Sequence, residues 1–214
     1  MTRIFCFGDS ITYGESDTDS GGWVELLKRF YLIQGPKGLP QKTLVYNLGV
    51  ASETVDGLEQ RFSNELASRM SSKADNVVVL SYGINDLTKI TDRFGKSKNR
   101  VPLDYFVNKL QSCIELALDK NIRVIVTTIL PFASQDDGVE NIYHEVRFAK
   151  DVDLYNQAIK LMSDKTGCTL LDLNSRFVNQ QHEQLLAVDR LHPNEKGHQL
   201  IFNEVKDLLD AQLV

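Results

Sequence analysis

Short runs of β-branched and aromatic residues alternate along the chain with longer segments whose apolar residues recur every three or four positions. Five runs are typical of buried parallel strands, four of them almost entirely apolar: residues 3–8, 43–49, 76–83, 122–130 and 169–174. Five segments predict amphipathic helices: 22–33, 54–71, 103–120, 151–165 and 194–213. This alternation predicts an α/β protein in which helices cover both faces of a doubly wound parallel sheet. The crossovers between its parallel strands are then expected to be right-handed.

Length and composition indicate one domain over residues 1–214, since 214 residues with 42% hydrophobic content can form one sizeable core. The net charge of −5 argues against a general affinity for nucleic acid or an anionic membrane. We find no apolar leader and no run long enough to span a bilayer, so a cytoplasmic protein is expected. The three cysteines lie far apart in apolar stretches and are predicted to be buried free thiols: Cys6, Cys113 and Cys168.

Three segments are predicted to be loops: 35–42, 88–102 and 131–147. Segment 35–42 is rich in glycine and proline, and the polar segment 131–147 is predicted to be mobile. Segment 88–102 carries five lysines or arginines. It is interpreted as a solvated surface loop, with contact to an acidic group of a substrate as the alternative.

Polar clusters follow the first three predicted strands: GDS at residues 8–10, NLG at 47–49 and GIND at 83–86. Each cluster alone is compatible with an ordinary turn, because turns favour glycine, asparagine, aspartate and serine. However, ligands of open α/β sheets bind beyond the carboxyl ends of the strands. Three such clusters at one edge therefore indicate a functional site.

The segment VDRLHPNEKG near the C-terminus supplies a candidate base. Asp189 precedes His192 by three residues, so its carboxylate can reach the Nδ1–H of the imidazole and leave Nε2 free to accept a proton. Pro193 keeps His192 out of the helical region, on a loop ahead of the last helix. Together with Ser10, these residues form a complete set for nucleophilic catalysis.

Four blocks, FGDSITYG, the glycine of NLGVASET, GIND and DRLHP, resemble in order those of the GDSL esterase/lipase family, the SGNH hydrolases. The resemblance spans nearly the whole chain. It implies a flavodoxin-like three-layer α/β/α sandwich with a five-stranded parallel sheet. It also implies that Ser10 is the nucleophile, His192 the base and Asp189 the residue that orients the base. The oxyanion hole would comprise the amides of Ser10 and Gly49 and the side chain of Asn85.

Two departures from the family pattern are visible. Ile11 replaces the leucine that names the family, and Ala51-Ser52 stands where relatives often carry a further glycine. The second change is expected to affect substrate fit, since the Gly49 amide is retained. Asp9, next to the nucleophile, is expected to brace the loop through hydrogen bonds.

The resulting hypothesis is a cofactor-independent serine esterase acting on small, short-acyl carboxylic esters, without a metal. Three further histidines lack metal-ligand spacing and are predicted at the surface: His144, His182 and His198. An acyltransferase on the same fold remains open, since only the acceptor differs. A flavodoxin-like module binding a phosphate or flavin through Ser10 and Thr12 is also open, although it leaves Asp189 and His192 without a role.

Overall fold

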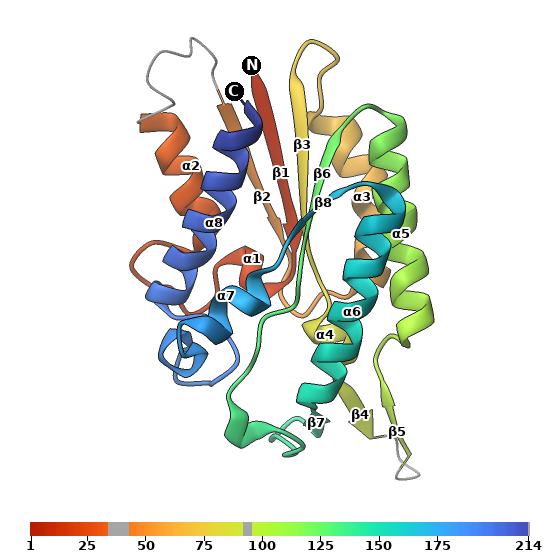
Figure 1. Ribbon diagram of the computed structural model, residues 1–214, viewed down its shortest axis with the longest axis vertical. Coiled ribbons are helices and arrows are strands. Elements are labelled where there is room, and N and C mark those ends of the chain that lie inside the picture. The colour runs from red at the N-terminus through yellow and green to blue at the C-terminus, as the bar shows by residue number, and fades with distance from the viewer. Residues whose placement is uncertain (34–42, 92–95, 214) are drawn as a thin grey trace.

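The computed structural model describes residues 1–33, 43–91 and 96–213. Its main sheet has five parallel strands in the order β2-β1-β3-β6-β8 (Figure 1). Their bounds are Thr2–Gly8 (β1), Thr43–Gly49 (β2), Asp75–Ser81 (β3), Arg123–Thr127 (β6) and Thr169–Leu171 (β8). Counted along the chain within this sheet, the order is 2-1-3-4-5, as in flavodoxin-like folds. The predicted fold class is confirmed; the predicted loop 35–42 lies outside the described residues.

Helices cover both faces of the sheet (Figure 1). One layer contains α2 (Trp23–Ile33), α7 (Leu173–Asn179) and α8 (Glu195–Leu213), and the other contains α3 (Val55–Arg69), α5 (Leu103–Asp119) and α6 (Ala149–Thr166). The periodicity of α5 explains its orientation, because the apolar residues at three- and four-residue spacing are the ones it buries: Phe106, Leu110, Cys113, Ile114 and Ala117. None of the described helices combines the length and apolar character needed to cross a membrane.

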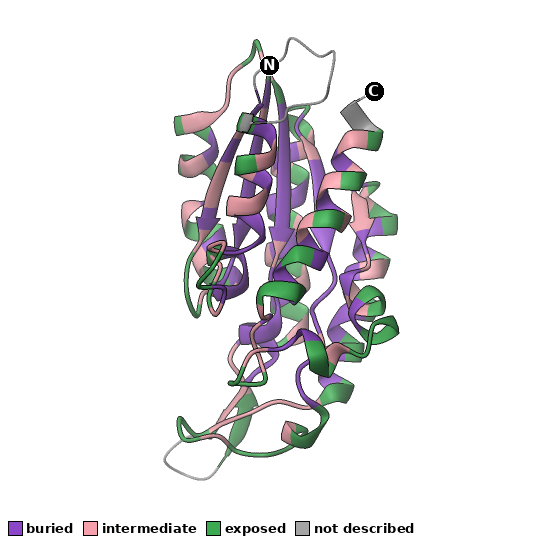
Figure 2. Ribbon diagram, turned by 90° about the vertical axis from the view of Figure 1, so that its left-hand side faces the viewer, coloured by how far each residue is buried: buried purple, intermediate pink, exposed green. Residues whose placement is uncertain are grey.

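The core lies along β1 and β3, two of the three strands with neighbours on both sides (Figure 2). Residues Ile4 to Phe7 of β1 are fully buried, as are Val77 to Leu80 of β3. The three cysteines are buried free thiols, as predicted. Burial raises the pKa of the Cys113 thiol to about 12, so this thiol is protonated and behaves as a small apolar side chain.

A second, antiparallel sheet lies beyond the carboxyl end of the main sheet, where only loops were predicted (Figure 1). It consists of β4 (Lys89–Thr91), β5 (Ser97–Asn99) and β7 (Glu145–Val146), in the order β5-β4-β7. The prediction of irregular loops over 88–102 and 131–147 was therefore wrong in part. These strands are two or three residues long and mostly polar, so no apolar run announces them.

Two glycines let the chain after β1 turn back onto the strand ends. Gly8 and Gly49 are paired in the register of β1 and β2, and the short helix α1 (Ser10–Tyr13) packs against them. A Cβ atom on Gly49 would lie 2.2 Å from the backbone nitrogen of Tyr13. A Cβ atom on Gly8 would lie 2.0 Å from the Thr12 hydroxyl oxygen. The start of α1 is therefore held directly on the sheet edge.

Gly49→Ala should destabilise the protein by about 1–3 kcal/mol, the usual effect of inserting a methyl group into a tightly packed site. The added carbon meets backbone atoms of α1, which cannot move away as a flexible side chain could. Urea denaturation of the wild type and the variant measures the change in unfolding free energy. An unchanged transition midpoint would show that α1 is not held this closely against β2.

Candidate active site

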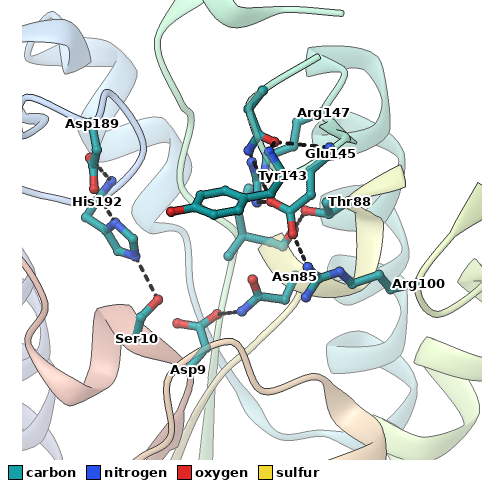
Figure 3. A network of polar contacts seen from close by, with 12 residues as sticks. Asp9, Ser10, Asn85, Thr88, Arg100, Tyr143, Glu145, Arg147, Asp189 and His192 are labelled. Carbon is teal, nitrogen blue, oxygen red and sulfur yellow. Dashed lines mark hydrogen bonds and ion pairs between the residues drawn. The ribbon is translucent and has the colours of Figure 1, made fainter. Parts of the chain in front are cut away.

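Ser10 is the first residue of α1, and only Asp9 separates it from β1. Asp9 caps this short helix, because its Oδ1 accepts a hydrogen bond of 3.0 Å from the Ile11 amide. Asp9 therefore braces the loop after β1 through a hydrogen bond, as expected. The Ser10 hydroxyl oxygen lies 2.8 Å from His192 Nε2 (Figure 3). The side chain at the end of β1 and the histidine near the C-terminus are thus brought together across 182 residues of sequence.

The loop before α8 holds His192 in a fixed orientation. Asp189 Oδ2 lies 2.6 Å from His192 Nδ1, and Asp189 Oδ1 accepts hydrogen bonds from the amides of Leu191 (3.1 Å) and His192 (3.0 Å). The carboxylate therefore binds both the backbone of its own loop and the imidazole ring. Asp189, His192 and Ser10 form one continuous series, with the connections that the sequence predicted (Figure 3).

The electrostatics of this series favour an anionic Asp189 and a more basic His192. Burial acts to raise the pKa of Asp189, but the hydrogen bonds from His192 and the two loop amides outweigh it and bring that pKa down to about 2. Burial likewise acts to lower the pKa of His192, but the Asp189 carboxylate outweighs it, with smaller contributions from Glu15 and Asp9, and the net direction is upward. The imidazole is therefore a stronger base than a free histidine.

Asn85 lies in the short helix α4 (Ile84–Leu87), which follows β3. Its buried carboxamide contacts the loop that follows β1 and the loop that follows β2. Nδ2 donates to the Glu53 carbonyl oxygen at 3.1 Å and makes a longer contact of 3.4 Å with Asp9 Oδ2. Asn85 is thus held in the cleft that also contains Ser10, and its predicted role as an oxyanion donor stays a prediction.

The structure does not support Gly49 as an amide donor to the site. Its N–H donates to Asn47 Oδ1 at 3.0 Å, and the residue lies outside the cleft that contains Ser10. The chain continues three residues further before it reaches the cleft, where Ser52 is part of the wall and has a φ of 62°. Relatives often carry a glycine at this point, and glycine readily adopts such a φ. That difference from the family pattern was the signal in the sequence that could have pointed to Ser52.

Ser10 and His192 lie in a cleft of about 1040 Å³. One wall consists of Ser10, Ser52 and Asn85 at the edge of the main sheet, and another comes from the segment between Phe132 and Arg147. Tyr143 extends from that segment into the cleft (Figure 3). Among the described residues, no three histidine, cysteine or acidic side chains converge into a metal-binding group.

Comparison with known families agrees with this geometry. The chain matches the GDSL-like Lipase/Acylhydrolase family over residues 6–200. The chain belongs to this family. This membership makes it a carboxylic ester hydrolase of the GDSL type. No curated protein sequence gives a significant match.

Solved structures of a lipase/acylhydrolase and of two esterases share the fold across almost the whole chain. A lipase/acylhydrolase from Enterococcus faecalis is 21% identical, with a TM-score of 0.76 and coverage of 99% of this chain and 97% of that one. The esterase EstA from Pseudoalteromonas sp. is 19% identical, with a TM-score of 0.70 and coverage of 99% and 98%. A variant of an acetyl xylan esterase from Geobacillus stearothermophilus is 22% identical, with a TM-score of 0.67 and coverage of 94% and 90%.

A buried ionic cluster beneath the site was not foreseen from the sequence. Arg61 of α3 donates to Glu53 Oε1 (2.8 Å) and to the Leu48 carbonyl oxygen (2.6 Å), and the Tyr82 hydroxyl donates to Glu53 Oε2 (2.6 Å). The Glu53 side chain is only 8% exposed. These contacts fix Glu53, whose carbonyl oxygen in turn accepts from Asn85. No motif marks the three side chains, since they come from separate elements.

Two arginines share one carboxylate on the opposite wall of the cleft. Arg100 and Arg147 both form ion pairs with Glu145, and Asn141 Nδ2 donates to the same carboxylate at 3.2 Å (Figure 3). The cluster ties the chain after β5 to β7. Arg100 belongs to the predicted basic segment 88–102, so this charge is paired within the protein rather than freely solvated.

His198 was predicted at the surface but is fully buried. Its Nδ1 accepts from the Trp23 amide at 3.3 Å, and its Nε2 lies 3.1 Å from the Glu15 carbonyl oxygen. Because one partner only donates and the other only accepts, the ring is a neutral imidazole with its proton on Nε2. Burial lowers its pKa, which is consistent with this state. His144 is exposed as predicted, whereas His182 is half-buried.

The pKa of His192 in the folded protein should lie above 6.5, the ordinary value for histidine. The folded state then binds this proton more tightly than the unfolded chain. The resulting stabilisation is fully present below pH 6.5 and is lost as the pH rises through the folded-state pKa. An NMR titration of the imidazole signals measures it, and Asp189→Asn should lower the value. Equal pKa values in the wild type and Asp189→Asn would contradict the assigned coupling.

Proposed function

We propose that this GDSL hydrolase is a serine esterase for small carboxylic esters with short acyl groups, using Ser10, His192 and Asp189. The observation that carries the proposal is the unbroken hydrogen-bonded series from the Ser10 hydroxyl through the His192 imidazole to the Asp189 carboxylate, with distances of 2.8 Å and 2.6 Å. A serine hydroxyl is a weak nucleophile unless a neighbouring base removes its proton. His192, oriented by Asp189, is positioned to do so.

The reaction proceeds in two halves. In the first, Ser10 Oγ forms a bond to the ester carbonyl carbon while its proton passes to His192 Nε2. The bond from that carbon to the alcohol oxygen then breaks, and the Nε2 proton moves to the leaving oxygen. In the second half, water attacks the acyl-enzyme with the same base, which releases the acid and restores Ser10.

Negative charge on the carbonyl oxygen would be met by Asn85 Nδ2 and by the backbone amides of Ser10 and Ser52. Among the described residues, neither amide has a hydrogen-bond acceptor, and Ser52 shares the cleft with Ser10 and Asn85. Asn85 would exchange its long contact with Asp9 for the oxyanion, while the Glu53 carbonyl oxygen keeps the carboxamide in place. Such preorganised donors stabilise the transition state.

Two structural neighbours support the reaction and the size of the acyl group. The Pseudoalteromonas esterase is described as inhibited by monoethylphosphonate, and the Geobacillus enzyme as an acetyl xylan esterase. A phosphonate on a serine imitates the tetrahedral intermediate of ester hydrolysis, and acetyl is a short acyl group. We extend both properties to this chain on the strength of its family and its cleft.

Ser10→Ala and His192→Ala should each abolish nearly all esterase activity, and the double variant should lose little more. The two side chains act in one proton transfer, so their effects are not additive. Hydrolysis of p-nitrophenyl acetate measures the rates, and a fluorophosphonate should label the wild type at Ser10. Labelling of another serine, found by peptide mapping, would refute the assignment of the nucleophile.

Asn85→Ala should lower kcat by roughly 100- to 1,000-fold, the usual effect of removing one oxyanion donor. The loss falls on kcat because the donor meets charge that develops only in the transition state. Steady-state kinetics separates kcat from KM, with circular dichroism to check the fold. A variant whose KM rises at unchanged kcat would place Asn85 in ground-state binding instead.

Acetyl to butyryl esters should be hydrolysed with higher kcat/KM than long-chain esters. A methylene contributes about 0.8 kcal/mol only where an apolar wall buries it. The apolar side chains on the 131–147 wall include Ile142 and Tyr143, which are 86% and 74% exposed and so leave a long tail in contact with water. A series of C2 to C12 esters measures the preference. A rate that still rises at C10 would reveal a long apolar channel.

A further inference from the structure

Glu15 occupies a fixed position beside the catalytic histidine, at the end of the turn that follows α1. Its amide donates to the Ser10 carbonyl oxygen at 3.0 Å, and its own carbonyl oxygen accepts from buried His198 at 3.1 Å. The backbone of Glu15 is therefore held on both sides, once by the nucleophile's residue and once by α8. A residue anchored in this way presents its side chain in a restricted region of space.

That side chain is directed toward His192. Glu15 Oε2 lies 3.9 Å from His192 Nε2, the nitrogen that also faces the Ser10 hydroxyl, and the carboxylate is half exposed in the wall of the cleft. Within the described part of the chain, no lysine or arginine pairs with it. Two other acidic residues of the cleft pair with arginine: Asp136 with Arg190, and Glu145 with Arg100 and Arg147. The remaining two, Glu140 and Asp189, each contact a histidine nitrogen at 2.6 Å, much closer than the 3.9 Å between Glu15 and His192.

We propose that the Glu15 carboxylate binds a hydroxyl group on the alcohol part of the ester, so that the enzyme prefers esters of alcohols with a neighbouring free hydroxyl, such as glycols, glycerol and sugars. This inference rests on the proposed function. The leaving oxygen must lie within hydrogen-bond distance of His192 Nε2 to receive its proton. The same nitrogen is 3.9 Å from Glu15 Oε2, so a hydroxyl on the adjacent carbon comes within reach of the carboxylate.

The charges around Glu15 favour a neutral donor over a cation. An ionised carboxylate only accepts hydrogen bonds, so its ligand must supply an N–H or O–H group. His192 is positively charged in the tetrahedral intermediate, until its Nε2 proton passes to the leaving alcohol. A positive charge on the alcohol would be repelled by that imidazolium, whereas a hydroxyl is not. The arginines of the cleft add little to this repulsion, because Arg100 and Arg147 are paired with Glu145 and Arg190 is paired with Asp136.

The test compares two acetates that differ in one donor: 2-hydroxyethyl acetate and 2-methoxyethyl acetate. The wild type should favour the hydroxyethyl ester in kcat/KM by about five- to tenfold, slightly less than is usual for a hydrogen bond to a charged group, because Glu15 is half exposed. Glu15→Ala should bring the ratio close to one. Glu15→Gln should retain part of it, since the amide oxygen still accepts. Glu140→Gln removes a charge elsewhere on the cleft wall and should keep the wild-type ratio.

The outcomes separate the two proposals. Hydrolysis of neither ester by the wild type would refute the esterase function itself. Hydrolysis of both esters at equal rates would refute only the role of Glu15. A Glu15→Ala variant that lowers both rates by the same factor would refute that role too, because the carboxylate would then act through His192. Acetylcholine and its uncharged analogue 3,3-dimethylbutyl acetate form a further pair. A preference for acetylcholine that Glu15→Gln removes would assign Glu15 to a cationic alcohol and overturn the hydroxyl assignment.

Discussion

The close contact between α1 and the ends of two strands is the constraint on which the active site depends. Gly8 and Gly49 lie side by side in β1 and β2, and neither has a side chain to hold the helix away. As a result the chain turns immediately after β1, and Ser10 becomes the first helical residue at the sheet edge. A bulkier residue at either position would displace the nucleophile relative to everything that must meet it.

The in-register pairing of β1 with both neighbours brings the remaining groups to the same level. Gly8 is paired with Gly49 on one side and with Ser81 on the other, so the loops after all three strands start at one edge. The Asn85 carboxamide joins these loops through Asp9 and the Glu53 carbonyl oxygen. The position of each donor therefore depends on sheet register more than on the stiffness of any single loop.

The sequence predicted those features that depend on periodicity or on short spacing. Alternating apolar patterns define the sheet and its helices, and three residues suffice to place Asp189 against His192. Features set by the path of a loop were missed: the cleft is lined by Ser52 and not by Gly49, and nothing in the sequence marks His198 as buried. The β4-β5-β7 sheet was missed because pairing between short polar segments leaves no local signal.

The start of α8 carries two histidines that act on opposite ends of α1. His192, just ahead of the helix, contacts the Ser10 hydroxyl, and His198, within its first turns, binds the Glu15 carbonyl oxygen just beyond α1. His198 belongs to α8 and His192 lies three residues ahead of it, so both contacts join this end of the helix layer to α1. Glu15 is also held by the Ser10 carbonyl oxygen, so the 3.9 Å between Glu15 and His192 depends on both the nucleophile's residue and α8. The base is thus positioned from the helix layer, while the nucleophile is positioned from the sheet edge.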